Sequence, residues 1–252
     1  ERRRELSFRH PDAVLVSART GEGLEELKER ITRRVEEAMG ADYLGRLAPM
    51  FVGTIHGYCF RLLQDQVPEY GNFDVLDPHR HAGLLSREYK RLNLARFGSA
   101  HWAPIARFAQ AVDIVSNELI PEALLAGIEF GECYRAYLDT LDRYHYLTFG
   151  LIIVKAIAAL ETPAIYERVH GALRFLFVDE YQDINPSQER LIELLGADPV
   201  QVCVVGDDDQ SIYQWRGADV TNILTFATRR PGVHKVELVT NRRSRPTIIE
   251  TA

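Results

Sequence analysis

Phe175-Leu-Phe-Val-Asp-Glu-Tyr-Gln-Asp183 is the stretch that decides the fold of this chain. Its first four residues are apolar and predict a short buried strand, which ends at two adjacent carboxylates, Asp179 and Glu180. Ligands of parallel α/β sheets bind at the carboxyl ends of the strands. Two carboxylates there suit one acid that holds Mg²⁺ and another that orients a water molecule. The alternative is a strand that leads into a helix with an acidic first turn, since acids favour the positive end of the helix dipole.

A second stretch, Val204-Val-Gly-Asp-Asp-Asp-Gln-Ser-Ile-Tyr-Gln-Trp-Arg-Gly-Ala218, also begins as a buried strand and breaks into a polar turn. Gln210 is therefore expected at the carboxyl end of a strand, within reach of the same ligand as the two acids. Tyr213, Trp215 and Arg216 follow within a few residues. Aromatic side chains can stack on bases, and an adjacent arginine can neutralise a phosphate. Because Trp215 lies beside Tyr213 and Arg216, we favour a base-stacking role for it over a place in the hydrophobic core.

The segments around these stretches alternate between strand and helix patterns, which predicts an α/β fold with a parallel sheet. The predicted strands are 13–16, 49–52, 175–178, 200–205 and 236–239, and the predicted helices between them are 22–39, 55–67, 187–195 and 218–228. Helical patterns replace strand patterns from about residue 76 to 170, with helices near 79–92, 103–117, 130–144 and 149–160. We therefore expect one α/β domain, formed by residues 1–75 and 171–252, that an all-α insertion subdomain interrupts at 76–170.

Composition excludes several classes of protein. The chain has 252 residues, 46% hydrophobic and 26% charged, as expected for a globular protein, and its net charge of -6 excludes a generally basic nucleic-acid binder. The chain has three cysteines, Cys59, Cys133 and Cys203, which are widely spaced. Their odd number and spacing argue against a disulfide framework or a zinc site and predict a reducing, cytoplasmic setting. The most apolar run, 151–160, contains Lys155 and is too short to span a bilayer, so no membrane partner is expected.

Four motifs resemble those of one known family. Asp179-Glu-Tyr-Gln-Asp183 and Gly206-Asp-Asp-Asp-Gln-Ser-Ile-Tyr-Gln-Trp-Arg-Gly-Ala-Asp219 resemble the Walker B motif and motif III of the UvrD/Rep/PcrA family of superfamily 1 DNA helicases. Thr54-Ile-His-Gly-Tyr58 is similar to that family's threonine-x-histidine motif, and Asn241-Arg-Arg-Ser244 to its motif IV. The order and spacing also fit from about residue 48 to the end. The resemblance implies the N-terminal RecA-like lobe of a P-loop NTPase.

Carried over by position, the resemblance implies ATP and Mg²⁺ as cofactors. Asp179 would hold Mg²⁺, and Glu180 would be the base for the hydrolytic water. Gln210 would sense the γ-phosphate and couple it to the DNA site. Arg243 would touch the γ-phosphate as an arginine finger, a role that contributes roughly 10³–10⁵ in rate in phosphoryl transfer.

The same resemblance implies single-stranded DNA as the partner, together with a duplex junction for the full-length motor. Thr54 and His56 would contact the single strand. Tyr213 and Trp215 would stack on its bases, each stack contributing roughly 1–3 kcal/mol, and Arg216 would lie close to its backbone.

The chain departs from the family pattern in three places. The motif IV tyrosine, which stacks on adenine, is Arg242 here, although a guanidinium can also stack on a ring. Leu147-Thr-Phe-Gly-Leu151 keeps the phenylalanine of the family's acidic motif but lacks its aspartates. No phosphate-binding G-x-x-x-x-G-K-[ST] loop is present, since none of the lysines follows a glycine, and no motif of a second RecA-like lobe is found. We therefore expect the isolated chain, which resembles the middle of a helicase, to hydrolyse ATP negligibly.

Residues 12–31 have two interpretations. Where the family carries a Thr-Phe-Thr-Asn-Lys-Ala-type motif that touches DNA, this chain has Val16-Ser-Ala-Arg-Thr-Gly-Glu-Gly-Leu-Glu-Glu-Leu27. Ser17-Ala18 and Thr20-Gly-Glu-Gly23 are similar to the guanine-binding motif of translational-type GTPases. Either the segment is a diverged DNA-contact motif, or the first forty or so residues come from a different context, as we slightly favour on the sequence alone.

The motifs therefore predict part of an ATP-dependent 3′-to-5′ DNA helicase, an enzyme of the kind that serves DNA repair, replication restart or recombination. The alternative is a non-catalytic single-stranded nucleic-acid-binding module that retains helicase motifs. That alternative predicts salt-sensitive binding, lost on Trp215→Ala, without any dependence on nucleotide. A GTPase is a third reading, which rests on residues 17–23 alone and which calorimetry with guanine nucleotides tests.

Overall fold

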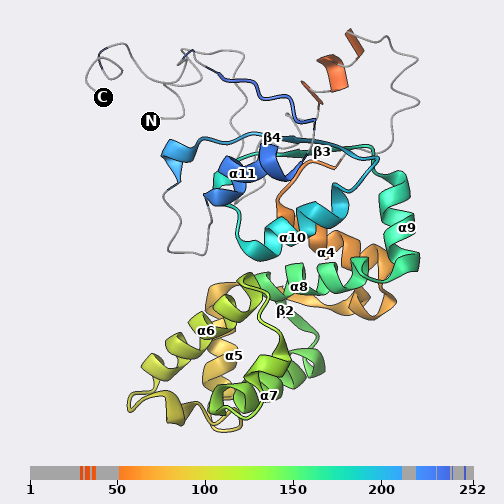
Figure 1. Ribbon diagram of the computed structural model, residues 1–252. Helices are drawn as coiled ribbons and strands as arrows, with labels where there is room; N and C mark the ends of the chain where they lie inside the picture. The colour runs from red at the N-terminus through yellow and green to blue at the C-terminus, as the bar shows by residue number, and fades with distance from the viewer. Residues whose placement is uncertain are drawn as a thin grey trace.

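The computed structural model describes most of the chain between residues 51 and 238 (Figure 1). The described residues are 29, 30, 32–34, 36, 37, 51–211, 220–230, 232–238, 240 and 247. The predicted strand at 13–16 and most of the predicted helix at 22–39 lie outside them.

Helices form most of the described structure. The α-helices are α4 (Ile55–Gln66), α5 (Pro78–Arg87), α6 (Trp102–Asn117), α7 (Glu129–Arg143), α8 (Phe149–Leu160), α9 (Pro163–Ala172), α10 (Pro186–Leu195) and α11 (Thr221–Arg229). The 3₁₀ turns are η1 (Pro68–Asn72), η2 (Leu94–Phe97), η3 (Glu122–Leu125), η4 (Tyr181–Asp183) and η5 (Asp208–Gln210). The strands are β1 (Asp74–Leu76), β2 (Tyr146–Thr148), β3 (Phe175–Val178) and β4 (Gln201–Val204).

Strands β3 and β4 form a parallel pair, with Phe175 beside Gln201 and Val178 beside Val204. This register places the carboxyl ends of the two strands side by side. Val178 is buried in a small core with residues of α10 and α11, whereas Phe175 and Phe177 are 62% and 75% exposed. The predicted strand and its parallel pairing are confirmed. The prediction that the strand is buried is wrong within the described residues, because their helices cover only one face of the pair.

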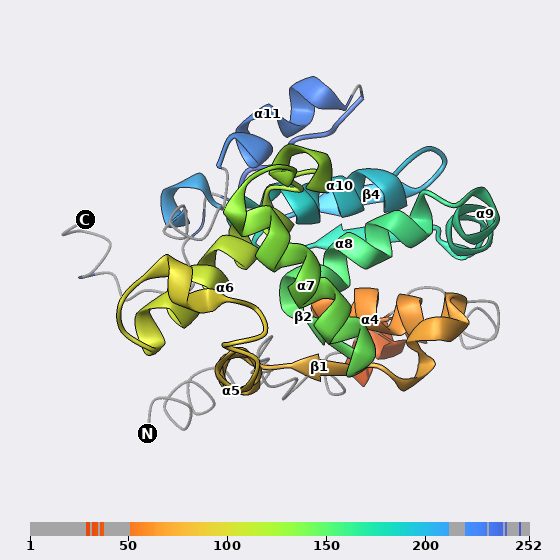
Figure 2. The same cartoon turned by 90° about the horizontal axis from the view of Figure 1, so that it is seen from below.

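A second parallel pair joins the two ends of the helical region. Strand β1 pairs with β2, with Asp74 beside Tyr146 and Leu76 beside Thr148. Figure 2 shows β1 leading directly into α5. Strand patterns did not predict this pair, because each strand has only three residues and is too short to show alternation.

Helices α5, α6 and α7 gather at one end of the molecule, away from β3 and β4 (Figure 1). Their core contains Phe108 and Tyr137, which are 1% and 0% exposed and meet edge to face with ring centroids 5.5 Å apart. The Tyr137 hydroxyl also lies 2.9 Å from Nε2 of the buried His81. All four helices predicted between residues 79 and 160 are present, and α6, α7 and α8 match their predicted ends to within one residue. Helix α5 ends at Arg87, earlier than the predicted residue 92.

Helix α8 connects this helical end to the β3–β4 end. It packs against α4, α6 and α10, and Ile152 and Ile153 are 1% and 0% exposed. Its apolar residues surround the helix, which is the pattern of a helix buried on all sides. Within the described residues no single helix has the length and apolarity needed to cross a membrane; α8 and α9 reach that threshold only as a pair, which bends by 98°.

Two strand predictions fail where their residues are described. Residues 51 and 52, and 236–238, are not in strands. An apolar run forms a strand only when a neighbouring backbone pairs with it, and within the described residues neither run has such a neighbour. The remaining residues of these two predicted strands, 49, 50 and 239, are not among the described residues.

Gly131 provides a test of the packing between η3 and α7. A Cβ atom at Gly131 would overlap the carbonyl oxygen of Leu125, whereas a Cβ at Gly83 in α5 would meet nothing within 4 Å. We expect Gly131→Ala to lower the free energy of unfolding by about 1–3 kcal/mol, the usual cost of overpacking. The matched control, Gly83→Ala, should raise it by about 0.5–1 kcal/mol, because alanine restricts the unfolded chain. Urea unfolding measures both, and equal stability of the two variants would contradict the close approach.

Candidate functional site

The two predicted acids follow β3 at the edge where the parallel strands end. Asp179 and Glu180 are both exposed. Glu180 has φ 54° and ψ 43°, in the left-handed region that non-glycine residues rarely adopt. The amide N–H of Glu180 donates to Oδ1 of Asp179 over 3.0 Å. The backbone therefore turns sharply here and presents both carboxylates beyond the end of the strand.

Backbone hydrogen bonds hold the ends of β3 and β4 together. The N–H of Val205 donates to the carbonyl of Val178 over 2.8 Å, and the N–H of Tyr181 donates to the carbonyl of Val205 over 2.9 Å. The ladder thus continues past both strands. It brings the residues after β3 next to the polar turn after β4.

Gln210 lies in the acidic turn that follows β4. Asp207 begins the turn, and its side chain accepts a hydrogen bond from the N–H of Asp209 over 3.1 Å. Nε2 of Gln210 donates to Oδ2 of Asp207 over 2.5 Å. Gln210 is thus held to the start of its own turn, at the same sheet edge as the two acids.

Gln182 connects the two halves of this edge, and sequence reasoning assigned it no role. Its side chain is 1% exposed. Its Nε2 donates to Oε2 of Glu180 over 2.7 Å, and its Oε1 accepts from the N–H of Asp207 over 3.0 Å. The available signal was the motif itself, in which a polar residue stands among acids just after an apolar strand.

Asp183 adds a third carboxyl group close to Glu180. Burial, followed by the negative charge of Glu180, raises the pKa of Asp183 above its ordinary value. Its Oδ1 is buried and has no hydrogen-bond partner within the described structure. The charges of the site therefore already repel each other, which favours a cation at this edge.

Thr54 and His56 lie at the start of α4. Thr54 caps the helix, and its hydroxyl oxygen accepts a hydrogen bond from the N–H of Gly57 over 3.0 Å. The His56 ring meets the ring of Phe149 edge to face, with centroids 5.3 Å apart. Burial lowers the pKa of His56, so its ring is neutral at pH 7. Phe149 is the phenylalanine kept from the acidic motif, and the structure places it against the predicted DNA-contact histidine.

The described structure brings some predicted residues together and separates others. Asp179, Glu180 and Gln210 share the edge formed by β3 and β4, whereas Thr54 and His56 share the contact between α4 and α8. The remaining predicted site residues lie outside the described residues: Tyr213, Trp215, Arg216 and Arg243.

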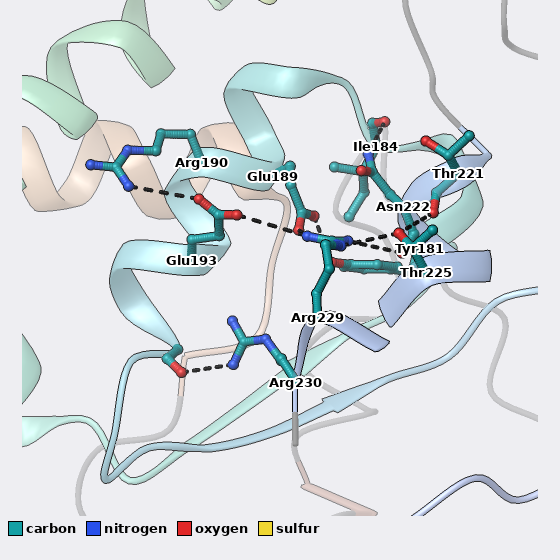
Figure 3. Close-up of polar contacts among 11 residues, drawn as sticks. Tyr181, Ile184, Glu189, Arg190, Glu193, Thr221, Asn222, Thr225, Arg229 and Arg230 are labelled. Atoms are coloured by element: carbon teal, nitrogen blue, oxygen red, sulfur yellow. Dashed lines mark hydrogen bonds and ion pairs between the residues drawn. The ribbon is translucent and has the colours of Figure 1, made fainter. Parts of the chain in front are cut away.

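A network of hydrogen bonds and ion pairs joins α11 to α10 and to Tyr181, the residue that follows Glu180 (Figure 3). The hydroxyl of the buried Tyr181 donates to Oε2 of Glu189 over 2.5 Å, and Nη1 of Arg229 donates to Oε1 of the same carboxylate over 2.5 Å. Arg229 also donates to the carbonyl of Asn222 and to Oγ1 of Thr225, both on α11. Burial, with the bond to Glu189, raises the pKa of the Tyr181 phenol. The network joins the residue after Glu180 to α10 and α11.

We expect Arg229→Met to lower the free energy of unfolding by about 1–3 kcal/mol, because it leaves the Glu189 carboxylate without its charged donor. Only 10% of the Glu189 side chain is exposed, so water cannot fully replace that donor. Arg190→Met is the matched control. Its partners Glu161 and Glu193 are 53% and 45% exposed, so its loss should change stability by less than about 0.5 kcal/mol. Urea unfolding of both variants compares them, and equal losses would contradict this account of the network.

The residues at the strand ends fit a magnesium nucleotide rather than a metal held by protein alone. Mg²⁺ bound with phosphates usually takes one or two carboxylates and keeps several waters. Asp179 offers one exposed carboxylate at the place where ligands of parallel sheets bind. Within the described residues, no group of three or more His, Cys, Asp or Glu side chains is arranged to hold a metal ion.

Comparison with known proteins identifies relatives along most of the chain. Residues 7–231 match the family model described as the UvrD/REP helicase N-terminal domain. The chain is 31% identical over 253 residues to proteins named "ATP-dependent DNA helicase PcrA" from Staphylococcus aureus (strain Mu50 / ATCC 700699) and Staphylococcus epidermidis (strain ATCC 12228 / FDA PCI 1200). Each alignment covers 96% of this chain and 33% of the relative. The chain therefore spans about a third of the length of these curated relatives.

The range of the family match also bears on the first segment of the chain. It begins at residue 7 and so includes residues 12–31, for which the sequence allowed two origins. The match favours the interpretation of this segment as a diverged part of the family's own domain.

Proposed function

Because the chain belongs to the UvrD/REP helicase family, we propose that it is the N-terminal RecA-like lobe, with a helical insertion at 76–170, of a motor that couples ATP hydrolysis to 3′-to-5′ movement on single-stranded DNA. The polarity is carried over from the family resemblance. A single observation supports the proposal best. The parallel pairing of β3 and β4 brings Asp179 and Glu180 to the same sheet edge as Gln210, at the carboxyl ends of the strands, where ligands of parallel sheets bind.

We assign the roles at this edge from the family resemblance, and the chemistry of the side chains is consistent with them. A bound Mg²⁺ would neutralise charge that develops during phosphoryl transfer. Asp179 would hold that ion, and Glu180 would accept the proton of the attacking water. Gln210 would contact the γ-phosphate from the neighbouring turn. Arg243, which is not among the described residues, would also contact the γ-phosphate. The crowded negative charge of Glu180 and Asp183 supports a cationic ligand here.

The DNA side of the proposal rests on α4. His56 is neutral, so it would contact the strand by hydrogen bonding and stacking rather than by charge. The Thr54 hydroxyl accepts from the backbone and keeps its own proton to donate to a phosphate. Tyr213, Trp215 and Arg216 would supply stacking and a phosphate contact, with a duplex junction ahead of the strand in the full-length motor.

The test is ATP hydrolysis by the full-length protein that carries this chain, with and without a single-stranded oligonucleotide. The proposal predicts stimulation by the oligonucleotide. The isolated 252-residue chain is a control, and we expect negligible turnover from it because none of its lysines lies in a phosphate-binding loop. The rival function, a non-catalytic binding module, predicts salt-sensitive binding of the oligonucleotide by the full-length protein without hydrolysis.

We also propose a reducing, cytoplasmic location. The three cysteines are free thiols in the structure. Cys59 and Cys133 are buried, and burial raises the pKa of Cys59 to about 12, which makes that thiol unreactive.

A further inference from the structure

We propose that Gln182 is a positioning residue that ties the base Glu180 to the turn that carries Gln210. This inference rests on the proposed function, because it concerns the same ATP site. It adds a residue and a physical connection between the two motifs. The connection is a continuous chain of hydrogen bonds that runs from Glu180 through Gln182 and Asp207 to Gln210.

The orientation of the Gln182 amide follows from its partners. The N–H of Asp207 can only donate, so the atom of Gln182 that faces it over 3.0 Å must be the oxygen, Oε1. The NH₂ group then necessarily faces the Glu180 carboxylate, which accepts from it over 2.7 Å. A bond to a charged acceptor is among the stronger hydrogen bonds, and this one fixes the carboxylate of a residue whose backbone is left-handed.

Burial makes Gln182 a rigid link. The side chain is 1% exposed, so its amide group has little access to water. Gly206 provides the space for it. A Cβ atom at Gly206 would lie 2.6 Å from Oε1 of Gln182 and 2.6 Å from Cδ1 of Ile223. The turn after β4 can therefore approach the Gln182 amide only because residue 206 has no side chain.

The last step of the chain reaches Gln210. The Asp207 backbone is held by Gln182, and the Asp207 carboxylate accepts from Nε2 of Gln210 over 2.5 Å. A displacement of Gln210, such as contact with a γ-phosphate would produce, would pull on Asp207 and hence on the amide that orients Glu180. The base is thus placed for proton transfer only when the turn is in its proper position.

The experiment compares Gln182→Leu, which removes both bonds, with Gln188→Leu in the full-length protein. Gln188 is a matched control because its amide has a structural role only, in the capping box of α10 with Asn185. We expect Gln182→Leu to lower kcat with single-stranded DNA by about 10- to 100-fold, with the KM for ATP changed by less than about twofold. The control should lower the melting temperature without a change in kcat.

A double substitution tests whether the chain acts as one unit. If it does, Gln182→Leu combined with Gln210→Ala should lower kcat little more than the more harmful single change does. Losses that multiply would overturn the connection. Gln182→Glu is a second variant that tests the same bond to Glu180 if Gln182→Leu fails to fold. Its carboxylate still accepts from the N–H of Asp207 but cannot donate to Glu180, so kcat should fall here too.

The outcomes separate this inference from the proposed function. If the unsubstituted full-length protein shows no DNA-stimulated hydrolysis, the proposed function fails and the inference fails with it. If that protein is active, and Gln182→Leu and Gln182→Glu keep its kcat and its DNA stimulation as Gln188→Leu does, only the role of Gln182 is overturned.

Discussion

Replacement of Glu180 by glutamine in the full-length protein is expected to lower the DNA-stimulated rate of ATP hydrolysis by about 10²–10⁴-fold, the usual contribution of a general base. The amide has the shape of the carboxylate, and its oxygen can still accept the hydrogen bond from Nε2 of Gln182. It cannot accept a proton from water at neutral pH. The loss should therefore appear in kcat, with little change in the KM for ATP.

Two measurements show whether this loss is chemical. Glu167→Gln changes an exposed carboxylate of α9 and should leave kcat unchanged. The melting temperature of Glu180→Gln should not fall below that of the unsubstituted protein, because the Glu180 side chain is exposed, keeps its bond to Gln182 and no longer repels Asp183. Turnover that survives Glu180→Gln would remove Glu180 from the role of base.

Acidification from pH 7.5 to 4.5 is expected to cost the protein about 2–3 kcal/mol of stability through His81 alone, by the linkage between folding and proton binding. Burial lowers the pKa of His81 from its ordinary 6.5 to about 4. Between these two values the unfolded chain binds a proton that the folded chain does not. Stability from this group is therefore complete above pH 6.5 and falls as the pH decreases towards 4.

Urea unfolding at the two pH values measures this loss, and His81→Gln is the matched variant. Glutamine can still make a hydrogen bond to the Tyr137 hydroxyl, which lies 2.9 Å from Nε2 of His81, but it does not titrate. Acidification should lower the free energy of unfolding of the unsubstituted protein by more than that of His81→Gln, because all other groups titrate equally in both. Any stability advantage of the unsubstituted protein at pH 7.5 should therefore shrink or reverse at pH 4.5. A pH dependence that is the same with histidine and with glutamine would show that His81 is not the group responsible.

Much of the site could be predicted from local sequence. A short apolar run followed by two acids predicted the strand that ends just before Asp179, and a second apolar run predicted the strand before Gln210. Both predictions rest on chemistry within a few residues, where periodicity and turn-forming residues act directly. The family motifs extended the prediction to roles that no local pattern carries.

Gln182 could not be assigned in this way. Its two bonds reach Glu180, two residues away, and Asp207, which follows a different strand. The second bond exists only because β3 and β4 pair in parallel with their ends level. The same holds for Glu189 and Arg229, which meet across α10 and α11. A polar residue in a motif does not reveal by itself which distant group it satisfies.

The sequence by itself determined the four helices between residues 79 and 160, the two strands β3 and β4, and the two acids that follow β3. These follow from side-chain periodicity and from motifs that act over a few residues. The tertiary structure decided which face of β3 is covered, since Val178 is buried while Phe177 is exposed. It also decided that His81 is buried against Tyr137 and that Gln182 joins Glu180 to Asp207. The physical reason is that burial and hydrogen-bond partners depend on which elements pack together, and residues distant in the chain determine that packing.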